Sequence, residues 1–181
     1  MIATMMPERS SCMTRRRLLV LGGTAVTVLA TFSGASIGFG QSVDLVLGSY
    51  PARRLMRLAE LKPKTPVEFD YPTAEVKNFI VSLGERAGGG IGTAEDVVAF
   101  NTVCPHMGGP VGPDTYKPDY AMLGPCPMHL STFDLTKYGM VVSGHASDSL
   151  PQVALELRGE DIYAVGVLGL IYGYSTNPQG T

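Results

Sequence analysis

The hydrophobic positions of residues 42–181 fall in short runs that are typical of β-strands. These runs are 67–71, 76–83, 96–103, 138–142, 153–157 and 162–167. They alternate with polar residues or are rich in β-branched and aromatic side chains, and clusters of Gly, Asp or Ser separate them. Such a series of short strands predicts an all-β fold, an antiparallel sandwich or barrel. A short helical turn is expected only at 55–61, because Pro63 and Pro66 end it.

The first forty residues have a different pattern. A basic stretch ends at Arg17, an apolar run covers 18–32, and small residues follow at 33–36. This is the layout of an export signal, and Thr-Arg-Arg-Arg-Leu-Leu-Val at 14–20 resembles the twin-arginine consensus. We therefore expect residues 1–41 to be a twin-arginine (Tat) export signal, either cleaved or retained as a membrane anchor. We therefore expect a periplasmic protein. If the leader is retained, it would associate the protein with the membrane.

Composition and charge narrow the choice of function. The chain has 181 residues, of which 45% are hydrophobic and 17% charged, enough for one domain plus a leader and unlike a disordered chain. The net charge is −2, and removing the basic leader leaves about −5 on the rest. A domain of this charge lacks the basic stripe that nucleic-acid binding requires. Three cysteines are too few for a disulfide scaffold, and Cys12 lies in the leader.

A glycine-rich run at 88–92 superficially suggests a phosphate-binding loop. It lacks the glycine order of the dinucleotide and P-loop motifs, and no helical pattern follows it. We interpret it as a flexible hairpin or an insertion between strands.

Two segments concentrate the residues with metal-binding chemistry. Cys104 and His106 form a C-x-H motif, and after nineteen intervening residues Cys126 and His129 form a C-x-x-H motif. Two Cys and two His could bind zinc, but structural zinc motifs usually pair like ligands, whereas each segment here supplies one of each. A Rieske [2Fe–2S] cluster needs two thiolates on one iron and two imidazoles on the other. The mixed pairs favour this cluster, with a structural zinc site as the alternative.

The same motifs resemble the Rieske iron–sulfur family and, more narrowly, the small subunit of arsenite oxidase. The narrower resemblance rests on 104–108, 126–129 with Ser131, Phe133 and Asp134, the glycine-rich turn, 150–151 and the ending 165–173. It implies an antiparallel Rieske-type β-sandwich over 42–181, with a small inserted cluster-binding subdomain at about 103–151. It also implies that Cys104, His106, Cys126 and His129 hold the [2Fe–2S] cluster.

The resemblance further implies a role in electron transfer, with no substrate chemistry and no catalytic residue on this chain. In arsenite oxidases a large molybdopterin-containing subunit oxidises the substrate and passes electrons to the Rieske centre, and a periplasmic cytochrome c or cupredoxin collects them. The ligand histidines are then the expected exit edge. Two alternatives remain: the Rieske subunit of a related molybdenum enzyme such as iodate reductase, where electrons flow the other way, or of a quinol–cytochrome c oxidoreductase. A dioxygenase ferredoxin would be cytoplasmic, which the leader opposes.

Two departures from the common Rieske pattern concern the surroundings of the cluster. Quinol-oxidising relatives join the ligand loops by a disulfide, and the matching positions here are Gly109 and Met128. Losing a disulfide typically costs about 2–5 kcal/mol, which we expect burial against the large subunit to offset. Ser131 matches a serine whose hydroxyl bonds a cluster sulfur, whereas Phe133 stands where high-potential relatives have tyrosine. The missing phenol predicts a lower reduction potential, because hydrogen bonds to sulfur stabilise the reduced state.

Three further residues have no assigned chemistry. His145 is interpreted as a surface-loop residue, with a contact at the rim of the cluster or at a partner interface as the alternative. Tyr172 and Tyr174, near the C-terminus, are expected to serve in packing or in an interface rather than in electron relay.

Overall fold

The computed structural model describes residues 50–179, and the predicted leader, 1–41, lies outside this described part. The strands are β1 Arg53–Arg57, β2 Val67–Asp70, β3 Lys77–Ser82, β4 Val97–Asn101, β5 Tyr116–Lys117, β6 Met122–Leu123, β7 Thr132–Asp134, β8 Met140–Ser143, β9 Gln152–Arg158 and β10 Asp161–Leu168. Every pairing between these strands is antiparallel. The predicted all-β, antiparallel fold is therefore confirmed.

Helical structure in the described residues is limited to two short 3-10 turns, η1 Leu58–Glu60 and η2 Pro113–Thr115. The helical turn predicted at 55–61 is correct only in its second half, because residues 53–57 form strand β1. Pairing with β10 overrides the local helical pattern there, as tertiary contacts commonly do. Between residues 50 and 179, no helix is long and apolar enough to cross a membrane.

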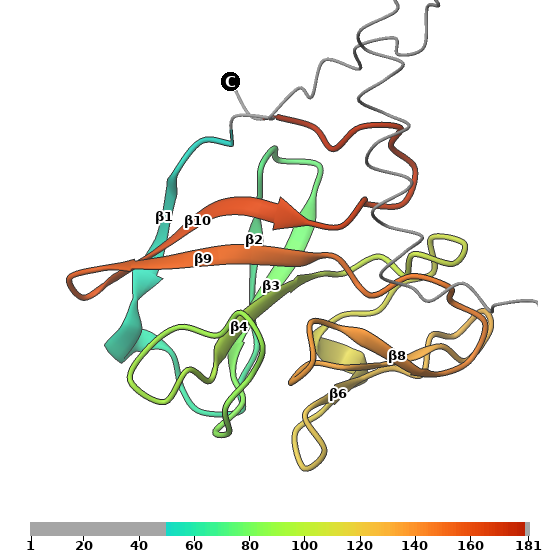
Figure 1. Cartoon of the computed structure of the whole chain (residues 1–181), viewed down its shortest axis with the longest axis horizontal. Helices are drawn as coiled ribbons and strands as arrows, with labels where there is room; N and C mark the ends of the chain where they lie inside the picture. The colour runs from blue at the N-terminus through green and yellow to red at the C-terminus, as the bar shows by residue number, and fades with distance from the viewer. Residues whose placement is uncertain (1–49, 180–181) are drawn as a thin grey trace, which may run out of the picture. The chain divides into compact units, whose positions relative to one another are not determined.

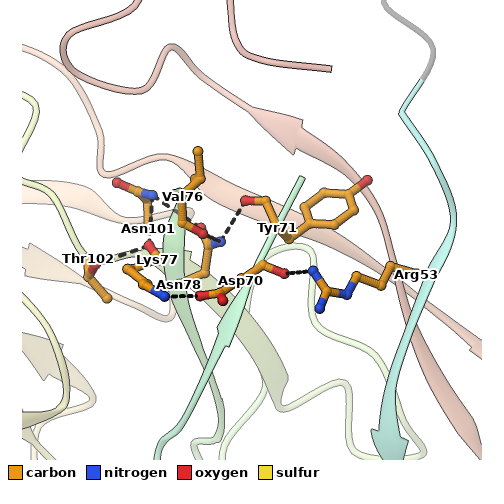
Figure 2. Close-up of polar contacts among 8 residues, drawn as sticks. All are labelled: Arg53, Asp70, Tyr71, Val76, Lys77, Asn78, Asn101 and Thr102. Atoms are coloured by element: carbon orange, nitrogen blue, oxygen red, sulfur yellow. Dashed lines mark hydrogen bonds and ion pairs between the residues drawn. The ribbon is translucent and has the colours of Figure 1, made fainter. Parts of the chain in front are cut away.

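The larger sheet has six strands in the order β1-β10-β9-β4-β3-β2 (Figure 1). Its two outermost strands are linked to each other, because the Arg53 guanidinium on β1 donates a 2.7 Å hydrogen bond to the Asp70 carbonyl on β2 (Figure 2). The sheet is therefore folded round on itself, as a sandwich or partly closed barrel requires.

Strands β3 and β4 serve two separate apolar cores. Their side chains alternate between the two faces of the sheet, as strand geometry dictates. Phe79 and Phe100 belong to a core shared with the cysteine motifs, whereas Ile80 and Ala99 belong to the core of the larger sheet. Because both faces are covered, β4 is buried along its whole length. This explains why its sequence is a continuous apolar run rather than an alternating one.

The smaller sheet has four strands in the order β5-β6-β7-β8. Along the chain it lies between β4 and β9, inside the segment 103–151, and Figure 1 shows it beside the larger sheet. Strands β4 and β9 pair with each other, and the Asn101 N–H donates a 2.9 Å hydrogen bond to the Pro151 carbonyl. The two ends of the insertion are thus held together at its base.

The glycine-rich run links the two sheets. The Gly88 N–H donates to the Thr136 carbonyl at 2.8 Å, and the Gly88 carbonyl accepts a 2.9 Å bond from the buried Gln152 side chain. A Cβ on Gly88 would lie 2.4 Å from the Tyr138 ring, so only glycine allows this approach. The run lies in the connection between the antiparallel strands β3 and β4, so the predicted hairpin forms, and these contacts pack it against the smaller sheet.

Candidate metal centre

Two loops with the same backbone pattern carry the Cys/His motifs: the first ligand loop (104–109) and the second ligand loop (126–131). In each, the cysteine N–H donates to the carbonyl five residues later, and the N–H four residues later donates to the cysteine carbonyl. These distances are 2.8 and 3.0 Å in the first ligand loop and 2.8 and 2.9 Å in the second. The fourth residue after each cysteine is left-handed, with φ of +73° at Gly108 and +61° at Leu130. The two turns present their cysteines in the same way.

The two cysteines are buried and adjacent. Cys104 and Cys126 are 1% and 2% exposed, and neither forms a disulfide within the described chain. Burial raises the pKa of the Cys104 thiol, and the neighbouring Cys126 raises it further. The His106 backbone N–H and the Ser131 hydroxyl act in the opposite direction by hydrogen bonding to the sulfur. Bound metal would hold such a buried thiol as thiolate.

The two motif histidines lie against each other. The ring centroids of His106 and His129 are 4.7 Å apart, at an interplanar angle of 81°. The Nδ1 atom of His129 is buried and has no hydrogen-bond partner within residues 50–179. A buried nitrogen left in this state is costly, and a metal ion would satisfy it. Two thiols and two imidazoles on paired loops supply the donor set of a Rieske [2Fe–2S] centre, although no three such side chains of the described residues meet at a single ion.

Gly109 and Met128, which occupy the expected disulfide positions, are packed together. A Cβ on Gly109 would lie 3.0 Å from Met128 Sδ and 2.6 Å from Cys126 Sγ. Gly109 itself is buried, whereas Met128 is half exposed. The methionine side chain therefore covers the space beside Gly109 through non-bonded contact, where relatives have a covalent link.

Ser131 and Phe133 both lie inside the site. Each is 0% exposed, and Phe133 on β7 belongs to the same apolar core as Cys104 and Cys126. Ser131 closes the second ligand loop through its carbonyl, and its hydroxyl lowers the pKa of the Cys104 thiol. Ser131 thus brings a polar group to the cysteines, and Phe133 adds an apolar ring to the core that contains them.

A third loop, 144–146, joins the site although its sequence carries no motif. His145 is exposed, yet its ring centroid lies 5.9 Å from that of His106 and 6.0 Å from that of His129. The alternative interpretation, a contact at the rim of the centre, therefore describes this residue better than an ordinary surface loop. A single histidine in a loop belongs to no motif, so the sequence alone could not favour the rim contact.

The first ligand loop is anchored by a buried polar network that the sequence did not reveal (Figure 2). The Asn101 side-chain amide donates to the Lys77 carbonyl at 2.9 Å and to Asn78 Oδ1 at 3.2 Å. Its Oδ1 accepts a 3.0 Å bond from the N–H of Val103, the residue before Cys104. The network thus fixes the backbone from which the first ligand loop departs.

The amide of Asn78 extends this network to the turn between β2 and β3. It donates to the carbonyls of Tyr71 at 2.8 Å and Val76 at 3.0 Å. Asn78 and Asn101 are 0% and 1% exposed, so their polar atoms depend on each other and on these carbonyls. Figure 2 shows the two asparagines side by side at the ends of their strands.

The C-terminal segment covers the other side of the first ligand loop. A Cβ on Gly108 would lie 2.7 Å from the Tyr172 ring, so the ring packs directly on this glycine. Tyr172 and Tyr174 remain partly exposed, at 43% and 37%. Tyr172 therefore has the packing role that the sequence predicted.

Comparison with known proteins identifies the family. A model of the Rieske [2Fe-2S] domain matches residues 54–154. The iodate reductase subunit IdrB of Denitromonas iodatirespirans is 54% identical, over 94% of this chain and 89% of the relative. IdrB of Pseudomonas sp. (strain SCT) is 51% identical, over 92% and 85%. The soluble domain of Rieske protein II (soxF) from Sulfolobus acidocaldarius shares the fold, with a TM-score of 0.62 and 24% identity over 72% of this chain and 85% of that one. The chain belongs to the Rieske [2Fe–2S] domain family, and its cofactor is a Rieske-type [2Fe–2S] cluster rather than zinc.

Proposed function

We propose that this chain is the Rieske electron-transfer subunit of a molybdenum oxidoreductase of the iodate reductase type. The observation that carries the proposal is the 54% identity to an iodate reductase subunit over 94% of the chain. This similarity favours a subunit of iodate reductase, which was the alternative in the sequence analysis, over the arsenite oxidase subunit, which was the first interpretation. The motifs of an electron-transfer subunit do not touch the substrate, so they could not separate the two enzymes.

We assign the cluster ligands to the four motif residues. Cys104 and Cys126 would hold the inner iron, because both sulfurs are buried in the apolar core. His106 and His129 would hold the outer iron. The assignment of His129 is supported by its buried Nδ1 atom, which has no hydrogen-bond partner among residues 50–179. A bound Rieske cluster supplies reversible one-electron transfer. The protein excludes water from the sulfur side and leaves the imidazole side partly accessible.

The surface around the histidines supports contact with partner proteins. Met107, Met128 and Leu130 are large apolar side chains that are half or more exposed in the two ligand loops. Exposed apolar groups gathered at one place often mark an interaction surface. We infer that electrons pass through this imidazole edge, between a large molybdopterin-containing subunit and a cytochrome c or cupredoxin.

We further propose that the chain acts in the periplasm. The twin-arginine pattern at 14–20 supports this location, because that route exports folded proteins already loaded with a cofactor. A leader retained as an anchor would attach the complex to the membrane. Fractionation of cells that express the full chain tests both statements.

Turnover by the assembled complex tests the function. The full chain is produced together with the large molybdopterin-containing subunit that we propose as its partner. The purified complex is then supplied with iodate and a reduced dye, or with arsenite and an oxidised dye. We expect iodate-dependent oxidation of the dye, and we expect it to disappear in the His129→Ser complex. Arsenite oxidation without iodate reduction would overturn the assignment in favour of the first interpretation.

A further inference from the structure

The loop 144–146 is fixed to the second ligand loop by backbone contacts. The N–H groups of His145 and Ala146 both donate to Ser131 Oγ, at 3.2 and 3.0 Å. A Cβ on Gly144 would lie 2.4 Å from the Ser131 backbone nitrogen and 2.3 Å from its Cα. The approach is therefore closer than any residue but glycine allows, and it brings two donors to a single hydroxyl oxygen.

This arrangement restricts the Ser131 hydroxyl. A serine hydroxyl has two acceptor lone pairs and one proton to donate. The two backbone N–H groups use the acceptor capacity, so the hydroxyl can add a further hydrogen bond only as a donor. Ser131 is 0% exposed, and its hydroxyl lies close enough to the Cys104 thiol to lower the pKa of that thiol.

We propose that the His145 and Ala146 N–H groups act as positioning groups that aim the Ser131 proton at the sulfur atoms of the cluster site. Donors that bind the oxygen also polarise its O–H bond, since hydrogen bonds in a chain strengthen one another. The third loop would thereby raise the reduction potential through Ser131. The inference rests on the bound cluster and is independent of which enzyme the chain serves.

The proposal assigns the effect to the backbone of residue 145 rather than to its imidazole. The imidazole is exposed and lies beside the ligand rings, whereas the N–H faces the buried serine. Proline and alanine at this position separate the two contributions. Alanine removes the ring and keeps the N–H, and proline removes both.

Voltammetry of the cluster-loaded full chain tests the proposal. Iron content and the EPR signal of the reduced protein are checked first, so that a missing cluster is distinguished from a missing effect. We expect His145→Pro to have a lower midpoint potential than His145→Ala, with the redox equilibrium shifted about two- to fivefold, where tenfold corresponds to about 59 mV for one electron. The difference should vanish when both substitutions are made in a Ser131→Ala chain. Equal potentials, or an undiminished difference in the Ser131→Ala chain, would overturn it.

A second pair of variants guards against failed assembly. Ala146→Pro and Ala146→Gly repeat the comparison at the other donor. Pulsed EPR of the reduced, unsubstituted chain requires no proline. It should show an exchangeable proton coupling that Ser131→Ala removes and that His145→Ala retains. A spectrum that Ser131→Ala leaves unchanged contradicts the proposal.

Discussion

The two ligand loops share a backbone pattern but are supported in different ways. The first ligand loop leaves a strand fixed by Asn101 and is covered by the Tyr172 ring. The second is held by the backbone of the third loop, which bonds to Ser131. One loop is thus supported by side chains and the other mainly by backbone contacts.

This difference matters because the two loops are not joined by a disulfide: both of their cysteines are free within the described residues. Each loop needs its own support, and the contact of Met128 with Gly109 lies at the positions where the covalent link would be. A side chain can shift slightly and keep its contact, whereas backbone atoms that already touch cannot move closer together. The second loop should therefore respond more strongly to small substitutions in its support.

Substitutions of the cluster ligands should have the largest effect, and we expect the same effect in both ligand loops. Cys104→Ser and Cys126→Ser each remove a sulfur on which the cluster depends, so we expect each to abolish cluster assembly. Iron content and the visible absorption spectrum measure this. Retention of a full cluster by either variant would show that the two loops do not contribute equally.

Gly144→Ala should be the most damaging change outside the ligands. The new Cβ would meet the Ser131 backbone, which cannot move without shifting the second ligand loop. We expect a loss of about 3–5 kcal/mol in the free energy of unfolding, measured by thermal or urea unfolding. Gly159→Ala is the matched control, because Gly159 also has a positive φ of +63° but no described atom lies within 4 Å of its added Cβ. That control should lose only about 1 kcal/mol, and equal losses would refute a steric cause.

Removing the anchor of the first ligand loop should have an intermediate effect. Asn101→Ala leaves the Val103 N–H and Asn78 Oδ1 without partners in a buried site, at about 1–3 kcal/mol for each group. We expect a total loss of about 2–4 kcal/mol in unfolding experiments. Thr102→Val, which removes an exposed 3.0 Å hydrogen bond to the Lys77 carbonyl, is the control and should lose under about 1 kcal/mol. The anchor role fails if the control loses as much.

The left-handed positions of the two ligand loops should respond with opposite signs. Gly108→Ala adds strain and displaces the Tyr172 ring, which should cost about 1–3 kcal/mol. Leu130→Gly removes a left-handed strain of about 1–2 kcal/mol from an exposed side chain, offset by about 0.5–1 kcal/mol of backbone entropy. We expect it to leave stability unchanged or slightly raised. Melting temperatures of the two variants test this, and a shared sign would contradict the equivalence of the turns.

Phe133→Tyr should have the smallest effect, on potential rather than on stability. Phe133 is buried in the apolar core that contains both cysteines, and a phenol at this position that donates to sulfur would stabilise the reduced state. An increase of about 20–60 mV corresponds to the net value of one hydrogen bond. Voltammetry of the full chain measures it. An unchanged or lower potential would contradict the claim that the absence of a tyrosine lowers the reduction potential.

The sequence predicted local features more successfully than features that depend on tertiary contact. Strand positions such as 76–83 and 153–157 follow from apolar runs, and the mixed Cys/His motifs identified the metal centre. The strand at 53–57 was missed because its pairing with β10 involves residues about a hundred positions away. Asn101 was missed for the same reason, and the rim contact of His145 was only the second interpretation, since neither residue belongs to a motif and their roles depend on neighbours brought close by the fold.

The central claim is that one Cys and one His from each ligand loop bind a single [2Fe–2S] cluster. Pulsed EPR of the reduced full chain, with nitrogen-15 in its histidines, tests this most directly. The account predicts coupling to two imidazole nitrogens, with cluster assembly or one coupling lost on substitution of either His106 or His129, and both couplings retained in His145→Ala. A reduced protein without an iron–sulfur signal, or a cluster with no imidazole nitrogen, would contradict the claim.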